Sequence, residues 1–386
     1  MINENLYKNF EDLTISKINR FKISSKDLNE LRASFKNKII LVSGAAGSIG
    51  SQFSKDIFNY NLKIKKIIFL DKDENMLTEL NRELLLNKNF KKANREFICS
   101  DINSIDISNL LIIKKVNFYL NFAAIKHVRS EENIQSLKYM FKTNSINFAP
   151  KKFVNLKKIF SISTDKTVNS SSILGVSKSL MEMKLSEYKK KNIFVSSVRF
   201  ANVAFSNGSI LKYIVDRLMQ KKEFGVPKNI RRFFITHREA SNLCLKSLLK
   251  RNNKKIVIPN PKTLNKDYLI TDLTARITKK FNFTPKFYKT NKLIKNYKNG
   301  ICNILLTTIS DGQKPFEEFV SKKEFVMKDS DKSICKVDLP KYDNKCNTIL
   351  STILNFNDIN KLKKYLSKQF KDYRPPKKYI KLSQTI

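Results

Sequence analysis

In residues 37–205, short apolar runs alternate with longer stretches of mixed polarity. The runs are rich in β-branched and aromatic residues, and they read KIILVS, IIFL, REFICS, VNFYLNFAA, KKIFSIS and IFVSSVRF. They are apolar on both faces, as strands are when helices cover both sides of a parallel sheet. The alternation predicts that residues 37–205 form an α/β domain, a Rossmann-type doubly wound parallel sheet.

The polarity pattern changes on both sides of this region. Residues 1–36 are mostly polar and predict an N-terminal arm with one docking helix, which Ser24 or Ser25 would cap. Residues 206–330 mix short helical patterns with Pro- and Asn-rich connections, which predicts a smaller substrate-binding region. Residues 331–386 predict a C-terminal helical tail.

Composition excludes a disordered chain and argues against a nucleic-acid partner. The 386 residues are 41% hydrophobic, which suffices for a buried core. Lys and Arg number 75 against 34 Asp and Glu, a net charge of +41. The lysines are scattered, as a composition-biased genome would place them, and are not clustered on one face with interleaved aromatics. We therefore expect no specific nucleic-acid binding, although phosphorylated small anions would be attracted.

The numbers and spacing of the cysteines and histidines, and the lengths of the apolar runs, narrow the possible classes of protein further. The five cysteines form no C-x-x-C pair or metal-ligand spacing, and the chain has only two histidines, so we expect no metal site and no disulfide scaffold. The first residues lack the apolar run of a signal peptide, and no stretch approaches the ~20 apolar residues that span a bilayer. These patterns predict a cytoplasmic protein without a membrane span.

A glycine-rich turn directly follows the first predicted strand. The sequence of residues 44–50 is G-A-A-G-S-I-G, and a helical pattern begins near Ser48. Glycine here lets the chain turn sharply off the strand, lets a pyrophosphate approach the backbone, and lets helix and strand pack closely. The helix N-terminus then directs free N–H groups at the phosphates. We expect a dinucleotide at Gly44, Gly47, Ser48, Ile49 and Gly50.

Residues at the ends of the next strands extend this prediction. Asp71 ends the second strand 21 residues beyond Gly50, where an acidic residue accepts hydrogen bonds from the adenosine ribose. Asp71 favours NAD as cofactor, and the neighbouring Lys72 keeps NADP as an alternative. Ligands of open α/β sheets bind at the carboxyl ends of the strands. We therefore also expect cofactor contacts from residues after the third and fourth strands, namely Asp101, Ile102 and Ala123.

The fifth predicted strand ends in a hydroxyl, a carboxyl and an amine. These groups belong to Thr164, Asp165 and Lys166, and Lys178 follows in the next helical pattern. Facing a nicotinamide at the edge of the sheet, such groups can pass protons among themselves. The four residues are the candidate catalytic residues.

Several segments carry a family resemblance. The spacing to Lys178 resembles the Y-x-x-x-K motif of the extended short-chain dehydrogenase/reductases, with Leu174 in the place of the tyrosine. The chain further resembles the nucleotide-sugar 4,6-dehydratases of the CapD-like polysaccharide-biosynthesis group in S-T-D-K at 163–166, A-A-I-K-H-V-R-S-E-E-N at 123–133, R-F-A-N-V-A-F-S-N-G-S at 199–209, R-R-F-F-I-T at 231–236 and D-G-Q-K-P-F-E-E-F at 311–319.

The resemblance implies NAD-dependent 4,6-dehydration of a nucleotide-activated N-acetylhexosamine, UDP- or GDP-linked, for surface polysaccharide biosynthesis. Thr164 would hydrogen-bond the carbon 4 oxygen, Asp165 would protonate the departing hydroxyl, and Lys166 would take the carbon 5 proton. Lys178 would hold the nicotinamide ribose, and the protein would form homo-oligomers. The substrate-binding residues implied in this way are Lys126, His127, Asn202, Ser206, Ser209 and Arg232.

Alternatives stay open at this point. A nucleotide-sugar 4-epimerase shares the first hydride step but needs no acid and base aimed at carbons 5 and 6. Leu174 leaves open which group deprotonates the carbon 4 hydroxyl, and it motivates a third alternative, a non-catalytic NAD-binding homologue.

The helix after Asn144 is shorter than in relatives by about one turn (~4 residues), and Pro150 predicts that this stretch is partly irregular.

Overall fold

A single large sheet organises the protein. The computed structural model describes residues 19–127, 131, 133–289, 297, 300–308, 314, 316–341 and 343–373. Within them, a nine-stranded sheet has the order β15-β16-β11-β6-β5-β4-β1-β2-β3. Its parallel strands are β1 (Ile39–Ser43), β2 (Lys66–Asp71), β3 (Asn94–Cys99), β4 (Phe118–Asn121), β5 (Lys158–Ile162), β6 (Phe194–Val198) and β11 (Lys255–Pro259). The antiparallel strands β15 (Met327–Lys328) and β16 (Ile334–Asp338) complete one edge. The predicted doubly wound sheet is confirmed.

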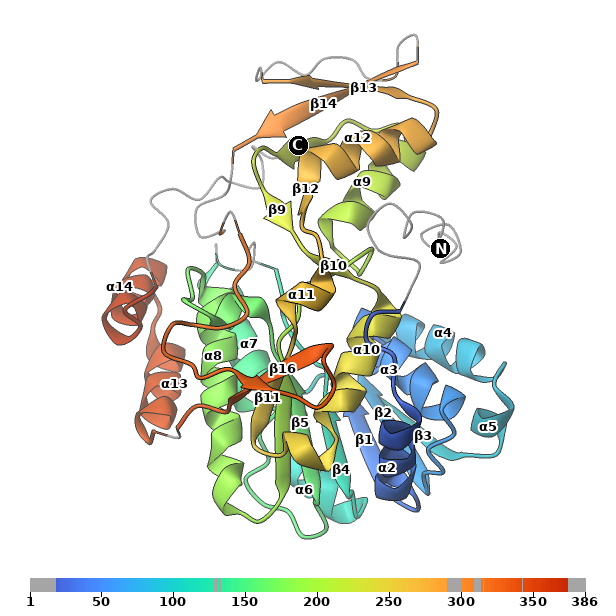
Figure 1. Cartoon of the computed structure of the whole chain (residues 1–386). Coiled ribbons are helices and arrows are strands. Elements are labelled where there is room, and N and C mark those ends of the chain that lie inside the picture. The colour runs from blue at the N-terminus through green and yellow to red at the C-terminus, as the bar shows by residue number, and fades with distance from the viewer. Residues whose placement is uncertain are drawn as a thin grey trace.

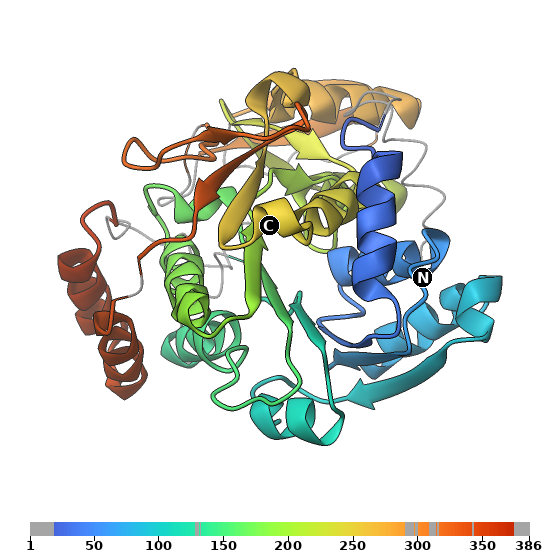
Figure 2. The same cartoon turned by 60° about the horizontal axis from the view of Figure 1, so that its bottom comes forward.

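Helices cover both faces of the sheet because its strands are apolar on both sides. One face carries α2, α3 and α10, and the opposite face carries α7 and α8 (Figure 2). The helices of this half are α2 (Ser25–Phe35), α3 (Ser48–Asn59), α4 (Glu74–Leu84), α5 (Lys88–Lys91), α6 (Ile107–Ile113), α7 (Ile134–Phe141), α8 (Ile173–Ser186) and α10 (His237–Ser247), with the short turns η3 (Asp165–Thr167), η4 (Glu187–Lys190) and η5 (Lys250–Asn252). The strand order reverses between β1 and β4, so the carboxyl ends of these strands form the crevice where such sheets bind ligands.

A smaller lobe lies above the carboxyl ends of the strands and is the upper part of Figure 1. Its sheets pair β7 (Asn202–Val203) with β10 (Phe234–Ile235), β9 (Arg231–Arg232) with β12 (Tyr268–Leu269), and β14 (Ile301–Thr307) with β8 (Gly225–Pro227) and β13 (Thr284–Tyr288). Its helices are α9 (Ile210–Met219), α11 (Pro261–Leu264) and α12 (Ile270–Lys280). α9 and α12 bury an apolar core of their own that includes Leu211, Ile214, Leu273 and Ile277.

Two C-terminal helices cover the outer side of α7 and α8. They are α13 (Lys345–Asn355) and α14 (Ile359–Gln369), at the left of Figure 1. Leu180 of α8 is fully buried in the apolar cluster that they form with α7 and α8, and Met183 packs against the same cluster. The apolar face of α8 is therefore covered by this chain's own tail.

The main sheet continues past residue 205, where the sequence pattern places the end of the Rossmann domain. β11 extends the parallel sheet, and β16 lies inside the tail that we expected to be helical. β16 escaped the sequence pattern because only its first and fourth residues, Ile334 and Val337, are buried, and its partner β11 decides its conformation. The tail is thus strand followed by helices, whereas the division into four domains stays a prediction.

The stretch after α7 is irregular, as the proline predicted. α7 passes into a π-helical turn, η2 (Lys142–Ile146), and regular structure ends before Pro150. Within the turn, the buried Asn144 accepts a hydrogen bond from the Ile125 N–H and donates to the Ser177 hydroxyl, at 2.9 and 3.0 Å. The shorter connection therefore still holds α8 and the segment after β4 together.

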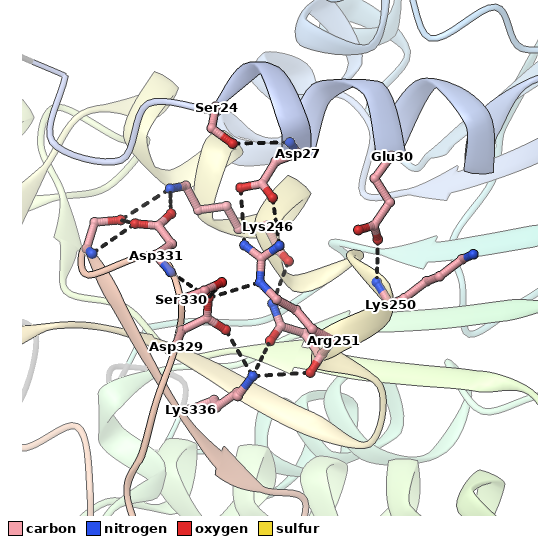
Figure 3. Close-up of polar contacts among 12 residues, drawn as sticks. Ser24, Asp27, Glu30, Lys246, Lys250, Arg251, Asp329, Ser330, Asp331 and Lys336 are labelled. Atoms are coloured by element: carbon pink, nitrogen blue, oxygen red, sulfur yellow. Dashed lines mark hydrogen bonds and ion pairs between the residues drawn. The ribbon is translucent and has the colours of Figure 1, made fainter.

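Ion pairs fasten α2 to the far edge of the sheet (Figure 3). Ser24 caps α2 by accepting from the Asp27 N–H, as predicted, and residues 1–18 lie outside the described part of the chain. Arg251 binds Asp27 through two nitrogens, at 2.6 and 3.1 Å, and donates to Asp329 at 2.9 Å. We call the group formed by Asp27, Lys246, Arg251, Asp329, Asp331 and Lys336 the α2 clasp.

Among the described residues, no helix combines the length and apolarity needed to cross a membrane.

Candidate active site

The predicted dinucleotide turn has the backbone that such a ligand requires. Gly44 has φ +68°, and a Cβ there would lie 2.4 Å from the Ala123 nitrogen. A Cβ on Gly50 would lie 2.1 Å from the Gly44 oxygen, so both positions exclude any other residue. Gly47 caps α3 without a side-chain hydrogen bond, which leaves the first N–H groups of the helix directed out of the turn. This cradle fits a dinucleotide pyrophosphate.

Asp71 lies beside the glycine turn. Its carboxylate accepts hydrogen bonds from the Ala46 N–H at 2.9 Å and the Asp73 N–H at 3.2 Å, which fixes it at the end of β2. The side chain is partly exposed, so its oxygens can also accept from a ribose. Lys72 instead lies over the ring of Tyr139, with its ammonium 3.3 Å from the hydroxyl.

The residues expected after β3 lie next to the same crevice. Asp101 accepts hydrogen bonds from the Asn103 N–H and from the Tyr139 hydroxyl, while Ile102 is buried. The Ala123 N–H donates to the Asn121 side chain at 3.2 Å, and the same Asn121 oxygen accepts from Ser43 at the end of β1. The predicted cofactor residues of β1, β2, β3 and β4 thus meet at one edge of the sheet.

Some of the predicted substrate residues form a layer over the glycine turn. The Asn207 N–H donates to the Ser48 hydroxyl at 3.0 Å, so the turn of residues 206–209 contacts the start of α3. The Lys126 ammonium lies 3.4 Å from the Ser206 hydroxyl, and a Cβ on Gly208 would lie 2.3 Å from the His127 ring. Ser209 has a structural role, because its hydroxyl caps the N-terminus of α9.

The three candidate catalytic groups after β5 meet at one carboxylate oxygen. Thr164 donates to Asp165 Oδ1 at 2.7 Å, and Lys166 Nζ lies 3.2 Å from the same oxygen. Asp165 is only 6% exposed, whereas the Lys166 side chain is 37% exposed. A proton can therefore move between hydroxyl, carboxylate and amine over hydrogen-bond distances.

Two further lysines lie near this group. Lys178 donates to the Ile162 carbonyl at 2.9 Å, and burial lowers its pKa to about 7, against a smaller opposing effect of Glu182. Lys126 is exposed as a whole residue, but protein atoms surround its ammonium group. This burial, and to a smaller extent the charge of Lys166, lowers the pKa of Lys126. Both effects favour the neutral amine.

Leu174 contributes no polar group to the site. It lies in the first turn of α8 and is 3% exposed, and its N–H donates to the buried Glu131 carboxylate at 3.0 Å. The place of the family tyrosine is therefore taken by a buried leucine.

Glu317 is a member of the site that the sequence analysis missed. Its side chain is only 3% exposed, and it accepts hydrogen bonds from the Phe233 N–H at 2.8 Å and from the Asn202 amide. Burial, together with the nearby charge of Asp165, raises the pKa of Glu317 to about 8, against the opposite effects of Lys166 and Arg232. The available signal was the E-E pair inside residues 311–319, of which 311–313 and 315 lie outside the described residues.

Arg232 and Asn202, both expected to bind the substrate, are engaged with the protein itself. Arg232 donates to the carbonyls of Arg231 and Lys314, both at 2.8 Å, and its Nε lies 3.9 Å from Glu317. Asn202 donates to the carboxylate of Glu317. Their contact with a nucleotide diphosphate stays a prediction.

Comparison with known proteins agrees with this architecture. Residues 40–338 match the family model described as "Polysaccharide biosynthesis protein". The capsular polysaccharide biosynthesis protein CapD of Staphylococcus aureus is 28% identical over 306 residues, which are 75% of this chain and 46% of CapD. The chain thus spans about half the length of this relative.

Relatives with two named activities also match. The inverting UDP-N-acetylglucosamine 4,6-dehydratase of Campylobacter jejuni is 27% identical over 236 residues, 58% of this chain and 67% of that enzyme. The UDP-glucose 4-epimerase of Rickettsia bellii is 27% identical over 230 residues, 55% of this chain and 62% of the epimerase.

A solved structure confirms the fold. DesIV, a dTDP-glucose 4,6-dehydratase of Streptomyces venezuelae with NAD and TYD bound, has a TM-score of 0.56 and 13% identity, and the match covers 86% of this chain and 98% of DesIV. Because the family model covers most of the sequence and the sheet has the Rossmann order, the chain belongs to the polysaccharide biosynthesis protein family, among the extended short-chain dehydrogenase/reductases that resemble nucleotide-sugar dehydratases.

Proposed function

We propose that the protein catalyses the NAD-dependent 4,6-dehydration of a nucleotide-activated N-acetylhexosamine, linked to UDP or GDP. The observation that carries this proposal is the grouping of Thr164, Asp165 and Lys166 at the end of β5. A dehydration needs an acid for the leaving hydroxyl and a base for the carbon 5 proton, and this group offers both within 3.2 Å.

The residues of the glycine turn are suited to hold the cofactor. The N–H groups at the start of α3 would bind the pyrophosphate, and Asp71 would accept hydrogen bonds from the adenosine ribose. We assign NAD in preference to NADP, because Asp71 would repel a 2′-phosphate and Lys72 lies over Tyr139. When bound, NAD supplies the hydride acceptor for carbon 4 and returns that hydride to carbon 6.

The proton transfers belong to the chain's own residues. Thr164 would hold the carbon 4 oxygen, Asp165 would donate a proton to the hydroxyl leaving carbon 6, and Lys166 would take the proton of carbon 5. Lys178, whose pKa burial lowers, would donate a hydrogen bond to the nicotinamide ribose. Lys126, His127 and Ser206 would border the substrate above the glycine turn.

A substrate panel tests this function. The protein is incubated with NAD and with UDP-, GDP- or CMP-activated sugars, and the products are analysed by mass spectrometry. We expect a UDP- or GDP-linked N-acetylhexosamine to yield a product lighter by one water. If every sugar nucleotide of the panel is recovered unchanged, the proposed function is wrong.

A 4-epimerase is the second candidate, because UDP-glucose 4-epimerases are among the sequence relatives. Asp165→Asn and Lys166→Ala distinguish the two reactions. In a dehydratase both substitutions stop the loss of water while hydride exchange at carbon 4 partly survives. In an epimerase the wild-type protein inverts carbon 4 without losing water.

Leu174 favours a third candidate, a non-catalytic NAD-binding homologue, because no tyrosine is available at this position. Calorimetry with NAD separates this candidate from the enzymes, since it predicts NAD binding without conversion of any sugar nucleotide. The cytoplasmic location and the homo-oligomer stay predictions.

A further inference from the structure

The segment that follows β2 places a cation between acids. Residues 71–74 read D-K-D-E, so Lys72 is flanked by the carboxyls of Asp71 and Asp73. The end of this strand is where dinucleotide-binding sheets contact the adenosine ribose, and a basic residue nearby accommodates a 2′-phosphate. The choice between NAD and NADP therefore depends on whether Lys72 is available to such a phosphate.

The Lys72 ammonium is engaged by a side chain of α7. Its Nζ donates to the Tyr139 hydroxyl at 3.3 Å and lies 5.3 Å from the centre of the Tyr139 ring. The same hydroxyl donates its proton to the carboxylate of Asp101, which follows β3. A tyrosine hydroxyl can be donor and acceptor at once, so its lone pair is left for Lys72. Ammonium, hydroxyl and carboxylate thus form one chain that holds Lys72 at α7.

Tyr139 is fixed by the packing of α7 and by the loop after β3. Its neighbours Met140 and Phe141 are fully buried in the core. The Asn103 amide, in the loop after β3, donates to the buried Thr143 hydroxyl at 2.7 Å, one turn beyond Tyr139. Helix and loop are therefore held together, and Tyr139 cannot follow Lys72 if the lysine turns elsewhere.

The contact with Tyr139 adds to the cost of moving Lys72. Lys72 is exposed and has a flexible side chain, so without this partner its ammonium could turn freely. The hydrogen bond to Tyr139 is the main cause of the raised pKa of Lys72, against the opposite effect of burial. A 2′-phosphate that recruits Lys72 must first break this bond, which lowers its apparent affinity. NAD carries a 2′-hydroxyl and needs no cation there.

We propose that Tyr139 is a specificity-determining residue for the cofactor, which keeps Lys72 away from the 2′ position of the adenosine ribose and thereby favours NAD over NADP. Tyr139 is a positioning residue, since it acts through Lys72. The inference rests on the dinucleotide site of the proposed function and deepens it, because it names a residue outside the glycine turn and β2 that separates the two cofactors.

Calorimetry of the full chain with NAD and with NADP tests the inference. The quantity compared is the Kd for NADP divided by the Kd for NAD. A general disturbance of the site, including the lost hydrogen bond to Asp101, acts on the parts that NAD and NADP share and leaves this ratio unchanged. Tyr139→Phe keeps the ring and removes the hydroxyl, so it releases Lys72. We expect the ratio to fall about tenfold through tighter NADP binding, as for release of one charge-assisted hydrogen bond.

Lys72→Met separates the effect of the ammonium from that of the hydroxyl. In the wild type we expect it to change the ratio little, because the ammonium is held by Tyr139. In the Tyr139→Phe background we expect it to raise the ratio about tenfold and so abolish the gain in NADP affinity. This non-additivity is the expected sign that the two side chains act as one unit. Lys72 is exposed, so its replacement removes no buried contact.

Lys138→Gln is the matched control. It removes the cation that precedes Tyr139 on α7, whose ammonium donates to Asn357, between α13 and α14, at 3.1 Å. We expect the ratio to stay at the wild-type value. The inference is overturned if Tyr139→Phe leaves the ratio unchanged, if Lys72→Met raises it equally in both backgrounds, or if Lys138→Gln lowers it as much as Tyr139→Phe does.

Calorimetry needs no turnover, so its outcome can be distinguished from that of the substrate panel. If the ratio responds as expected but every sugar nucleotide is recovered unchanged, the inference stands and the proposed dehydration is wrong. If a sugar is dehydrated but Tyr139→Phe leaves the ratio unchanged, the dehydration stands and the inference is wrong. If the wild type binds neither dinucleotide, both the cofactor assignment and the inference are wrong.

Discussion

Two of the buried charge clusters of this protein, the α2 clasp and the candidate active site, are built differently. In the α2 clasp every carboxylate faces cations, since Asp329 lies between Arg251 and Lys336, at 2.9 and 3.0 Å, and Asp331 binds Lys246. In the candidate active site Asp165 has Lys166 at 3.2 Å, whereas the buried Glu317 has Arg232 Nε at 3.9 Å and accepts hydrogen bonds from the neutral Asn202 amide and Phe233 N–H. Both clusters join the C-terminal part of the chain to the main sheet.

The pKa shifts follow from this difference. Burial acts to raise the pKa of Asp329, but the Asp331 N–H, Lys336 and Arg251 outweigh it, so the pKa falls below its ordinary range. At Glu317 burial and the charge of Asp165 act together, and the pKa rises. The surroundings of Asp329 and Asp331 thus favour their charged forms and stabilise the fold, whereas the surroundings of Glu317 favour its protonated form.

The largest expected effect is on catalysis. Asp165→Asn removes the proposed acid, and we expect turnover to fall by about 10²- to 10⁴-fold. The free energy of unfolding should change little, because Asn can still accept from Thr164, and loss of the ion pair with the partly exposed Lys166 is offset by loss of the repulsion from Glu317. Mass spectrometry of the product and urea denaturation measure the two quantities. A variant that loses stability as well would show that Asp165 is a structural residue.

Breaking the α2 clasp should have the reverse effect. Asp329 has no exposed side-chain surface, so Asp329→Asn leaves Lys336 without its carboxylate partner and Arg251 paired with Asp27 alone. We expect a loss of about 3 kcal/mol in the free energy of unfolding, at the lower end for a broken buried pair because Arg251 is partly exposed. Turnover per folded molecule should not change. If Asp329→Asn has the same free energy of unfolding as the wild type, water must already compensate the charges of Arg251 and Lys336.

The two clusters should also respond oppositely to pH. Folding takes up a proton at Glu317 between its ordinary pKa of 4.5 and about 8, so wild-type stability falls as pH rises through this window. Asp329, with its lowered pKa, contributes stability above its ordinary value of 3.8 that is lost as pH falls further. Thermal unfolding across pH should show a flatter neutral limb in Glu317→Gln and a flatter acid limb in Asp329→Asn. Parallel profiles in all three proteins would contradict the comparison.

The smallest effect is expected at an exposed pair beside the clasp. Asp338 is at the end of β16, is 65% exposed and pairs with Lys255 at 2.7 Å. Water screens this pair, so Asp338→Asn should change the free energy of unfolding by less than about 1 kcal/mol. Asp338→Asn, measured by the same urea denaturation, serves as the matched control for Asp329→Asn. A loss as large as that of Asp329→Asn would show that burial does not separate the two pairs.

Much of the fold could be predicted from local patterns. The six predicted strands β1 to β6 are present, because each contains a short run of mostly apolar, β-branched or aromatic residues between turn residues. β16 and the docking of α13 and α14 on α7 and α8 could not be predicted, since their partners are distant in sequence. The same holds for Glu317, whose neighbours Asp165, Asn202 and Phe233 come from other elements.

The sequence by itself determined the parts of the site whose chemistry is local. Gly44 has a positive φ, Gly50 leaves no room for a Cβ against Gly44 within the same turn, and Thr164, Asp165 and Lys166 are adjacent residues that meet at one oxygen. Only the tertiary structure decided which charges are paired and which are opposed. That outcome depends on burial and on distances between segments some 150 residues apart, because electrostatic energies are set by separation in space and by access of water.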